Sequence, residues 1–465
     1  MCFKKLFFAV VLSAGLFMTG CNKDKDNGGS TLSTGSVTDL DLAKIMNSPY
    51  SELTPEEQKA KLEQECIDFL DALNAATSLK ALDVFDNFLN LLDRAEPDVD
   101  DPWTENESKG KVQWILDLTG VYGVFTWDRN KWNKTSSKSE LKFIFPDKGT
   151  SGNNNASLSL KVVNSNYKIV DEWYDSYDKV TYEDIICVPS SATGILSLDN
   201  KEIAKIEAAA QYRKNPMELD GISVNPPEST QLKITTENNY VYWYSLSGSG
   251  KETKYEMQMS RDKKPLIETL FKVGIGLDTV FDGVEDIEDI EDIKKVFGKV
   301  GTMGFTKLMD NLVLVYQADD IPSFLIAVDK IDSERWRARE NLNFYNNPNY
   351  YAQMEIIEKK YIDDLAKAMN DYVKSSLAST KEKDITKIAE LVVKSEKVGE
   401  YYNGDYWNDY YWDWGYSYTK KYDEYGTKPY LKFGDGTLVE MEAYFSSGFD
   451  KLEKKWEDFI DAFNK

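Results

Sequence analysis

The chain contains no histidine among its 465 residues, and it has only four cysteines. Without histidine, Ser-His-Asp and Cys-His catalysis, histidine-ligated zinc and a histidine proton shuttle are all excluded. Two of the cysteines, Cys2 and Cys21, lie near the N-terminus, so Cys66 and Cys187 remain in the body of the chain. Both lie in apolar patterns and are expected to be small buried side chains, with a bridge between them left open.

Positive charge is also scarce, because 56 Lys and Arg residues face 79 Asp and Glu residues, for a net charge of −23. An acidic surface repels phosphates, so nucleic acid is not expected as a partner. Gly-x-Ser-x-Gly, Walker and dinucleotide motifs are missing, and no local signature marks a catalytic pair among the acids. The acidic repeat from Val284 to Ile293 lacks the glycine-bounded loop of a calcium site. We therefore assign no catalytic residue, no metal site and no cofactor.

The first twenty residues have the plan of a secretory signal peptide. Lys4 and Lys5 precede an apolar run from Leu6 to Met18, which is shorter than the roughly 20 residues that span a bilayer. The following Met18-Thr19-Gly20-Cys21 resembles the lipobox of bacterial lipoproteins. This resemblance implies that residues 1–20 are removed and that Cys21 carries the lipid, which is palmitate or a similar acyl chain.

The next residues are similar to those of Gram-negative outer-membrane lipoproteins. Asn22 follows the cysteine, at a position where an Asp often signals retention in the inner membrane, and Lys23 to Asp26 resembles an acidic signal for export to the cell surface. The resemblance implies a location at the outer membrane, on the cell surface, with the periplasmic face as the alternative. The body, including the stretch from Ser48 to Lys59, resembles surface lipoproteins with a helix–sheet–helix plan, and no catalytic residues come with it.

The mature chain divides into four segments. Residues 21–38 are rich in Gly, Ser, Thr and charge and predict a flexible tether. Residues 39–98 predict an N-terminal helical hairpin, because apolar residues recur every three or four positions after Thr54-Pro55 and again after Ser78. Residues 110–262 alternate in polarity, for example over 141–145, 157–162 and 255–260, and predict an antiparallel sheet in a sandwich or half-barrel. Residues 202–213 fit a strand by alternation and a helix by composition, and the flanking strands favour a strand.

Residues 263–465 are expected to be mainly helical. The clearest helical pattern runs from Tyr350 to Tyr372, and an aromatic stripe from Phe445 to Phe463 predicts a C-terminal helix. A β-hairpin is expected over 430–439, with its turn at Asp435-Gly436. The predicted fold class is therefore α+β, with helices at both ends of a central antiparallel sheet.

Residues 401–430 combine tyrosines and tryptophans with acids. Flat rings beside carboxylates suit a sugar ligand, and rigid aromatics suit a protein partner equally well. The third alternative is a loop that packs against its own domain. A shorter run of the same composition spans residues 173–178, and Tyr240 to Tyr244 is an aromatic strand in which core packing is favoured over a cavity lining. The candidate ligand-binding residues are Asp405, Trp407, Asp409, Tyr410, Tyr411, Trp412, Asp413 and Trp414.

These observations predict a lipid-anchored component of the cell envelope that binds a glycan or an envelope protein at the outer membrane. The alternative function is a glycosidase-like hydrolase that uses paired carboxylates on extracellular polysaccharide and needs no histidine. No feature of the sequence supports this enzyme over a binding protein.

The lipid anchor is directly testable. Changing Cys21→Ala should abolish metabolic palmitate labelling and should release the protein from the membrane fraction, because two or three acyl chains are needed for stable anchoring. Retained labelling of the Cys21→Ala protein would contradict the lipobox interpretation, and Cys66→Ala serves as the control that should label normally.

Overall fold

A computed structural model describes most of the chain after the predicted tether. The described residues are 37–74, 79–95, 112–113, 123–137, 140–175, 177, 179–214, 217–219, 222–225, 227–249, 251–277, 279–280, 287, 289–309, 311–342, 347–380, 385–404, 418–446, 451–452, 454–455 and 457.

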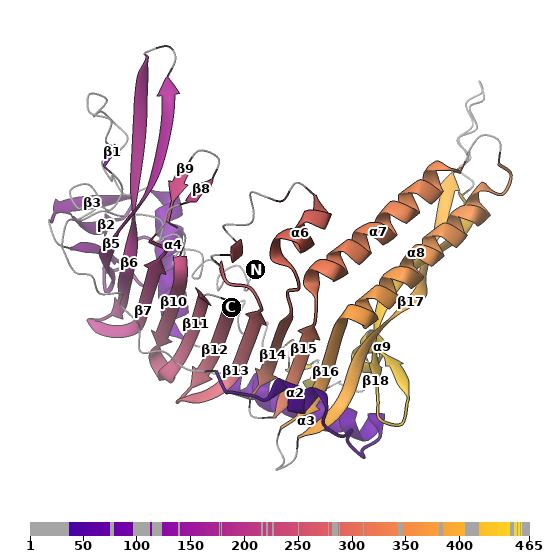
Figure 1. The fold of residues 1–465 in the computed structure, drawn as a ribbon. Coiled ribbons are helices and arrows are strands. Elements are labelled where there is room, and N and C mark those ends of the chain that lie inside the picture. The colour runs from indigo at the N-terminus through magenta and orange to yellow at the C-terminus, as the bar shows by residue number, and fades with distance from the viewer. Residues whose placement is uncertain are drawn as a thin grey trace, which may run out of the picture.

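One large, open and curved sheet organises the molecule (Figure 1). The order along it is β3-β2-β4-β5-β6-β7-β10, followed by β11 to β19 in sequence order, and all of these pairs are antiparallel except β2–β4. The strands are β2 Gly123–Asp128, β3 Lys131–Ser136, β4 Leu141–Phe145, β5 Ala156–Asp175, β6 Val180–Leu198, β7 Lys201–Tyr212, β10 Pro227–Thr236, β11 Tyr240–Ser249, β12 Glu252–Arg261, β13 Lys264–Val273, β14 Thr302–Leu308, β15 Leu312–Ala318, β16 Val373–Ser379, β17 Thr386–Gly404, β18 Tyr418–Lys432 and β19 Leu438–Glu440.

Short turns keep neighbouring strands adjacent in sequence. Asp199-Asn200 joins β6 to β7 and Asp262-Lys263 joins β12 to β13, and all four residues have positive φ, as two-residue hairpin turns require. Three further short strands, β1 Val112–Gln113, β8 Met217–Leu219 and β9 Ile222–Val224, attach to the outer part of the β5–β6 pair.

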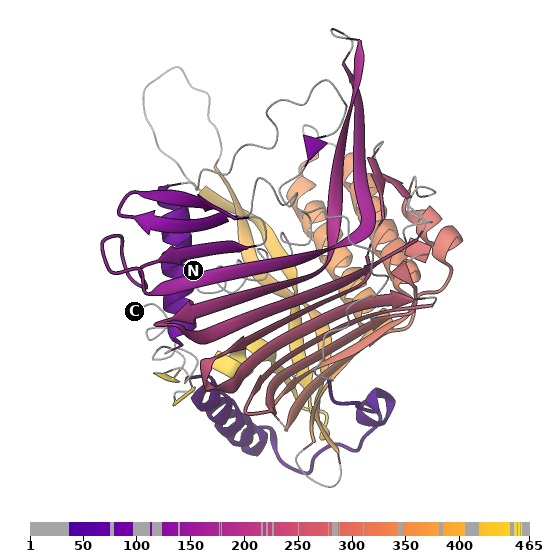
Figure 2. The same ribbon diagram turned by 90° about the vertical axis from the view of Figure 1, so that its left-hand side faces the viewer.

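Two hairpins extend well beyond the body of the sheet. β5 and β6 have 20 and 19 residues, and β17 and β18 have 19 and 15, whereas β7, the next longest strand, has 12. The two hairpins rise on the same side of the molecule from opposite ends of the sheet, and the view turned by 90° agrees (Figures 1 and 2).

The helices form layers on this sheet. They are α2 Leu42–Met46, α3 Pro55–Asn74, α4 Lys80–Arg94, α6 Ile290–Phe297, α7 Ile321–Glu340, α8 Tyr350–Tyr372 and α9 Met441–Ser446, with a 3-10 turn η1 at Glu237–Asn239. α8 packs on β16, β17 and β18, and α7 packs on α6 and α8. Among the described residues, no helix combines the length and the apolar character that crossing a membrane would need.

The N-terminal segment wraps around the sheet, and we call residues 37–51 the N-terminal strap. Val37, Leu42 and Ile45 pack with Ala378 on one face. Leu62 of α3 packs with Leu377. Because consecutive residues of a strand point to opposite faces, α2 and α3 cover opposite faces of the sheet. α4 lies on the α3 face farther along, where Phe88 meets the rings of Phe143 and Phe145.

The strap is fixed at the centre of the sheet by a buried carboxylate. Glu268 is 1 % exposed, and its Oε1 accepts hydrogen bonds from the Thr38 amide at 3.0 Å and from Gln258 Nε2 at 3.0 Å. Its Oε2 accepts one from Thr38 Oγ1 at 2.7 Å and lies 3.5 Å from Lys307 Nζ. β12, β13, β14 and the strap therefore meet at one ion pair, whose desolvation cost is offset by these donors.

The strap is fixed a second time where it passes β17. Lys387 donates its amide to the Pro49 carbonyl and accepts from the Ser51 amide, both at 2.8 Å, and its Nζ lies 2.9 Å from Glu390 Oε1. Burial alone would raise the pKa of Glu390, but hydrogen bonds from Lys387 and Tyr50 and the charges of Lys387 and Lys432 hold it below its ordinary value. Gly434 is needed here, because a Cβ at this position would lie 2.6 Å from the Tyr50 Cβ.

Several sequence predictions agree with these elements. The fold is α+β with a large antiparallel sheet, β7 (Lys201–Tyr212) covers all but the last residue of the predicted strand 202–213, and the hairpin at Asp435-Gly436 is β18–β19, with φ of +85° at Gly436. Helices form at 55–74, 80–94 and 350–372. The described residues do not confirm the expected packing of the first two helices as a hairpin; in them α3 contacts β13, and α4 contacts β6 and β7.

The expectation of a mainly helical region over 263–465 is wrong. β13 to β19 lie in this range, and the expected boundary at residue 262 falls in the two-residue turn between β12 and β13, so the sheet continues across it. The physical reason is that α7 and α8 are an insertion between β15 and β16, and their strong helical period masks the short strands on either side. Of the expected C-terminal helix, α9 covers Met441–Ser446 and most later residues lie outside the described part.

The structure describes the side chain of one of the two cysteines in the body of the chain. Cys66 on α3 is a half-buried free thiol, and burial together with the charge of Glu65 raises its pKa. Cys187 lies in β6 opposite Lys168, but its side chain is outside the described set.

The Glu268 ion pair should dominate the stability of the sheet centre. Removing one partner of a buried pair leaves the other charge uncompensated, so Glu268→Ala should lower the free energy of unfolding by about 3–5 kcal/mol. The matched control is Glu207→Ala, which breaks the more exposed 2.7 Å pair with Lys205 and should cost about 1 kcal/mol or less. Equal losses in the free energy of unfolding for the two variants, measured by urea denaturation, would contradict the central role of Glu268.

The strap contact at Glu390 predicts a pH dependence. A lowered carboxyl pKa adds stability that is present above the unfolded pKa of about 4.3 and is lost as the pH falls through the folded pKa. Glu390→Gln should therefore be less stable than the wild type by about 1 kcal/mol at pH 7, since the group is about one-third exposed and partly screened. The difference should vanish near pH 3 in urea unfolding, and a gap that stays constant with pH would contradict this account.

Candidate functional site

The residues chosen from the sequence fall outside the described part of the structure. Cys21 and the aromatic and acidic candidates between Asp405 and Trp414 all belong to this group. The two ends of the aromatic segment are nevertheless placed, because Asn403 pairs with Thr419 and Gly404 pairs with Tyr418. Residues 405–417 therefore connect the two strands of the projecting β17–β18 hairpin.

Tyrosines surround the base of this connection, and we call Tyr351, Tyr401, Tyr402 and Tyr422 the distal tyrosine cluster. The rings of Tyr401 and Tyr422 stack at 4.9 Å with an interplanar angle of 21°, and Tyr351 of α8 stacks on Tyr422 at 6.4 Å and 25°. Tyr401 is 37 % exposed and Tyr402 is 49 % exposed. Burial first, and then the charge of Glu358, raises the pKa of Tyr422. The cluster is thus anchored on its helix side and open on its outer side.

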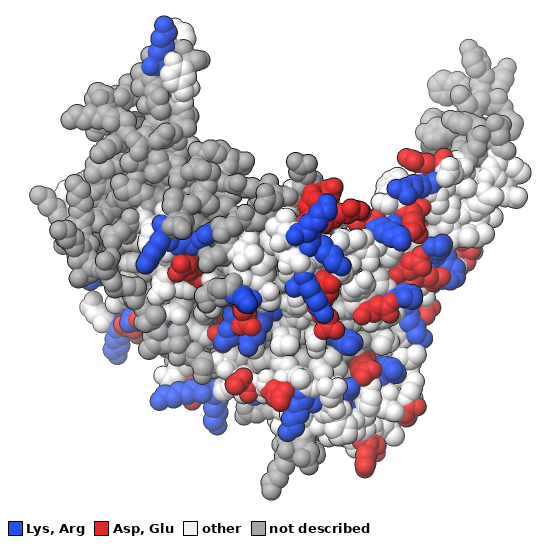
Figure 3. All heavy atoms as spheres, in the orientation of Figure 1, with Lys and Arg blue, Asp and Glu red and all other residues white. Residues whose placement is uncertain are grey.

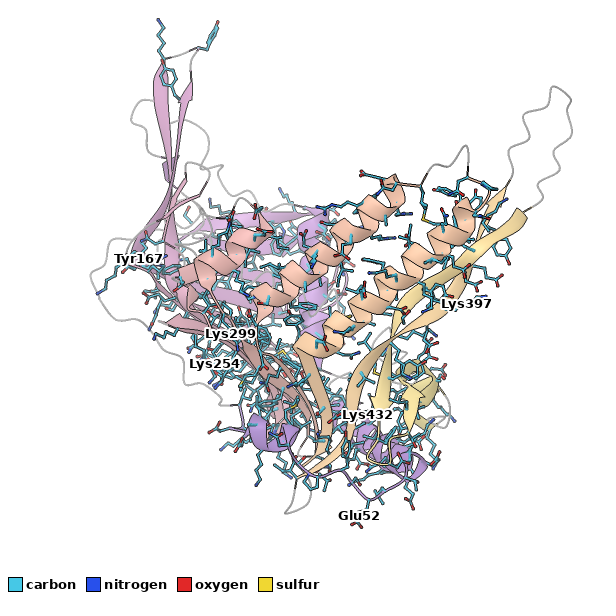
Figure 4. All side chains as sticks on the ribbon, turned by 45° about the vertical axis from the view of Figure 1, so that its right-hand side comes forward. Glu52, Tyr167, Lys254, Lys299, Lys397 and Lys432 are labelled. Carbon is cyan, nitrogen blue, oxygen red and sulfur yellow. The ribbon has the colours of Figure 1, made fainter. Side chains whose placement is uncertain are left out.

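Charged groups border the cluster. Lys397, labelled in Figure 4, bridges Glu400 at 2.6 Å and Asp423 at 2.8 Å. Tyr402 donates its hydroxyl to Glu400 at 2.5 Å. The Asp423 amide donates to Glu355 of α8 at 3.0 Å, which holds β18 against the helix. Carboxylates that accept hydrogen bonds therefore lie directly beside exposed rings.

α7 and α8 support the cluster from the side. Glu358 Oε2 accepts from Arg335 at 2.5 Å, and its Oε1 lies 3.3 Å from Arg339. The Arg339 guanidinium also lies 5.6 Å from the ring centre of Trp336, which is 59 % exposed. On the face seen in Figure 3, basic and acidic groups alternate along these helices, and no field of a single sign forms there. These ion pairs hold α7 against α8, the helix that carries Tyr351.

Among the described residues, the carboxyl groups whose pKa is clearly shifted are all held in the ionised form. The pKa is clearly shifted for four carboxyl groups, and in each case it is lowered, by hydrogen bonds or nearby cations that outweigh any burial. A lowered pKa favours the ionised form and does not provide the protonated carboxyl that a glycosidase needs. Among these same residues, no group of three or more acids and cysteines could hold a metal ion. The four carboxyl groups with a lowered pKa are those of Asp320, Asp363, Glu390 and Asp435.

The aromatic strand from Tyr240 to Tyr244 serves the core. Tyr240 is fully buried and donates its hydroxyl to the Ala72 carbonyl of α3 at 2.8 Å. Burial raises the pKa of Tyr242 to about 12. Trp243 packs on the opposite face with the N-terminal strap. The strand therefore contacts α3 on one face of the sheet and the N-terminal strap on the other.

The acidic repeat has a structural role where it is described. Asp289 is the N-cap of α6, its side chain accepts from the Asp292 amide, and Asp292 accepts from the Asp289 amide in return. This reciprocal capping box, with acids in the first turn, stabilises the start of the helix.

The structure also shows exposed aromatics that the sequence candidates omitted. Tyr174 is 62 % exposed and Tyr177 is 93 % exposed, both at the end of the β5–β6 hairpin. Their run of residues, 173–178, has the same composition as the 401–430 segment, and this composition was the available signal. Trp336, in contrast, stands in an ordinary helical pattern and gave no signal.

Comparison of the chain with protein-family models, with curated proteins and with solved structures finds no match.

Proposed function

We propose that the protein is a lipid-anchored binding component of the cell envelope, held at the outer membrane through Cys21. Its projecting β17–β18 hairpin, which we call the β17–β18 arm, contacts a glycan or a protein ligand. The observation that carries this proposal is the distal tyrosine cluster, which places exposed rings and carboxylates around the two ends of the Tyr-, Trp- and Asp-rich segment 405–417.

The chemistry of the arm favours a glycan. A sugar ring offers apolar C–H faces that lie on aromatic rings, while its hydroxyl groups hydrogen-bond to carboxylates, and both kinds of group are adjacent in the cluster. The eight candidate residues from Asp405 to Trp414 lie between the two strands in sequence and carry the same kinds of side chain. A protein ligand would use the same rings as rigid anchors, and it is an outcome that the experiment below distinguishes.

The position of the strap suits presentation of this arm away from the anchoring membrane. The strap lies at the bottom of the view in Figure 1, while the β17–β18 arm rises at the opposite side. The expected flexible tether of residues 21–38 would reach about 20–25 Å as a random coil, by the usual 5–6 Å per square root of length. We infer that the base of the sheet faces the membrane and that the arms face outward.

A glycan array tests the proposal. The triple variant Trp407→Ala, Trp412→Ala, Trp414→Ala and the double variant Tyr401→Ala, Tyr402→Ala should each bind at least tenfold more weakly than the wild type, since losing buried aromatic contacts costs more than about 1.4 kcal/mol. The matched control is Val398→Ala on the same strand, where an exposed apolar residue is shortened without loss of a ring.

Three results would count against the glycan proposal. Wild-type protein that binds no glycan would remove it, and equal binding by both aromatic variants would move the site away from this arm. Cleavage of a polysaccharide at a rate unaffected by these changes would favour the hydrolase alternative.

A further inference from the structure

The β5–β6 hairpin ends in a second exposed aromatic surface, which we call the β5–β6 tip and which comprises Tyr174, Tyr177 and Lys179. Both tyrosines are more exposed than any residue of the distal tyrosine cluster, and Tyr177 at 93 % exposure is the most exposed large aromatic of the described residues. Lys179 has a φ of +55°, as expected in the tight connection that precedes β6. The two tyrosines bury little apolar surface at this position, so they contribute little to the packing of the core.

Additional strand pairing widens the hairpin below its tip. β9 pairs with β5 at Val170 and Asp171, and β1 pairs with β6 at Asp184 and Ile185. At the base, where the β5–β6 register shifts between Asn164 and Lys168, Tyr212 of β7 donates its hydroxyl to the Pro189 carbonyl of β6 at 2.9 Å. These contacts restrict the hairpin, which lowers the entropic cost of presenting its tip to a ligand.

The two aromatic surfaces lie on the same side of the molecule. Both belong to the hairpins that project beyond the sheet, and both hairpins rise in the same direction from separate ends of it (Figures 1 and 2). A single long ligand that lies across this side would meet both surfaces. A short ligand would meet only one of them.

We propose that the β5–β6 tip is a second binding site for the ligand of the distal tyrosine cluster and that this ligand is a long neutral polysaccharide bound at both arms. This proposal rests on the proposed function, because it takes the glycan class from there. The rings of Tyr174 and Tyr177 supply exposed stacking surfaces for the apolar faces of sugar rings. A neutral chain also avoids repulsion from a protein of net charge −23.

The register of the hairpin argues against insertion of the tip into a bilayer. Asp171 pairs directly with Asp184, and Glu172 pairs directly with Glu183, only a few residues below the tip. At about 3.3 Å per residue, burial of the hairpin beyond about 10–13 Å would take these four acids into hydrocarbon. Each buried charge costs several kcal/mol, so a lipid ligand is disfavoured.

Two linked sites predict a dependence on ligand length. Engagement of the second site is intramolecular once the first is bound, so a polymer should bind about 10²-fold or more tightly than a short oligosaccharide of the same sugar. Loss of either site should reduce polymer binding toward the oligosaccharide value and should leave binding of the oligosaccharide to the remaining site intact.

The test uses the full lipidated protein in detergent, with affinity electrophoresis on a panel of mannan, glucan, xylan and galactan, and calorimetry with a tetrasaccharide of the sugar that binds. The variants are Tyr174→Ser with Tyr177→Ser, and Tyr401→Ser with Tyr402→Ser. Each pair should weaken polymer binding about 10- to 100-fold. The matched control is Val163→Ser, an exposed apolar residue of β5 near its base, and it should bind as the wild type does.

The outcomes separate the two proposals. Unchanged polymer binding by the Tyr174, Tyr177 variant, with loss in the Tyr401, Tyr402 variant, would overturn the second site and leave the proposed function standing. Wild-type protein that binds no polysaccharide would overturn both. Binding to phosphatidylcholine vesicles that is lost in the Tyr174, Tyr177 variant, without polysaccharide binding, would replace the glycan by a lipid surface.

Discussion

The buried carboxylate of Glu268 is the interaction on which the arrangement of the chain depends. An isolated charge at 1 % exposure would cost several kcal/mol, and it is tolerated here because Thr38, Gln258 and Lys307 all direct donors at it. Two of these partners belong to neighbouring strands and the third belongs to the N-terminal strap. The same ion pair therefore fixes the register of the central strands and the place where the chain enters the fold.

The strap and the helices that follow it cover both faces of the open sheet. The apolar residues of the strap cover one face, the strap crosses the sheet beside Lys387, and α3 and α4 then cover the other face. The two projecting hairpins have contacts of their own, since α8 packs on β17 and β18, and β9 and β1 pair with the outer parts of β5 and β6.

Much of the fold was predictable because strand and helix periods differ. Alternation identified β4, β7 and β12, and the three- and four-residue spacing identified α3, α4 and α8. The prediction failed over residues 263–465, where the seven-residue strands β15 and β16 adjoin the long helices α7 and α8 and continue the same sheet. The sheet crosses residue 262 through the local β12–β13 hairpin, but β15 pairs with β16 across the whole α7–α8 insertion, and no local pattern could show that pairing. The candidate site was predictable in composition at 401–430, whereas the stacking of Tyr351 on Tyr422 joins residues far apart in sequence.

The sequence by itself determined the chemistry available to this protein. The missing histidine, the acidic balance, the signal-like N-terminus ending at Cys21 and the two aromatic runs are all properties of composition and local order. Only the tertiary structure decided where these residues lie. The β5–β6 and β17–β18 pairs place the described residues of both aromatic runs on hairpins on one side of the molecule, and burial separated the structural tyrosines, such as Tyr240, from the exposed ones, such as Tyr177. Burial depends on what packs around a residue in space, and the order of residues along the chain does not specify it.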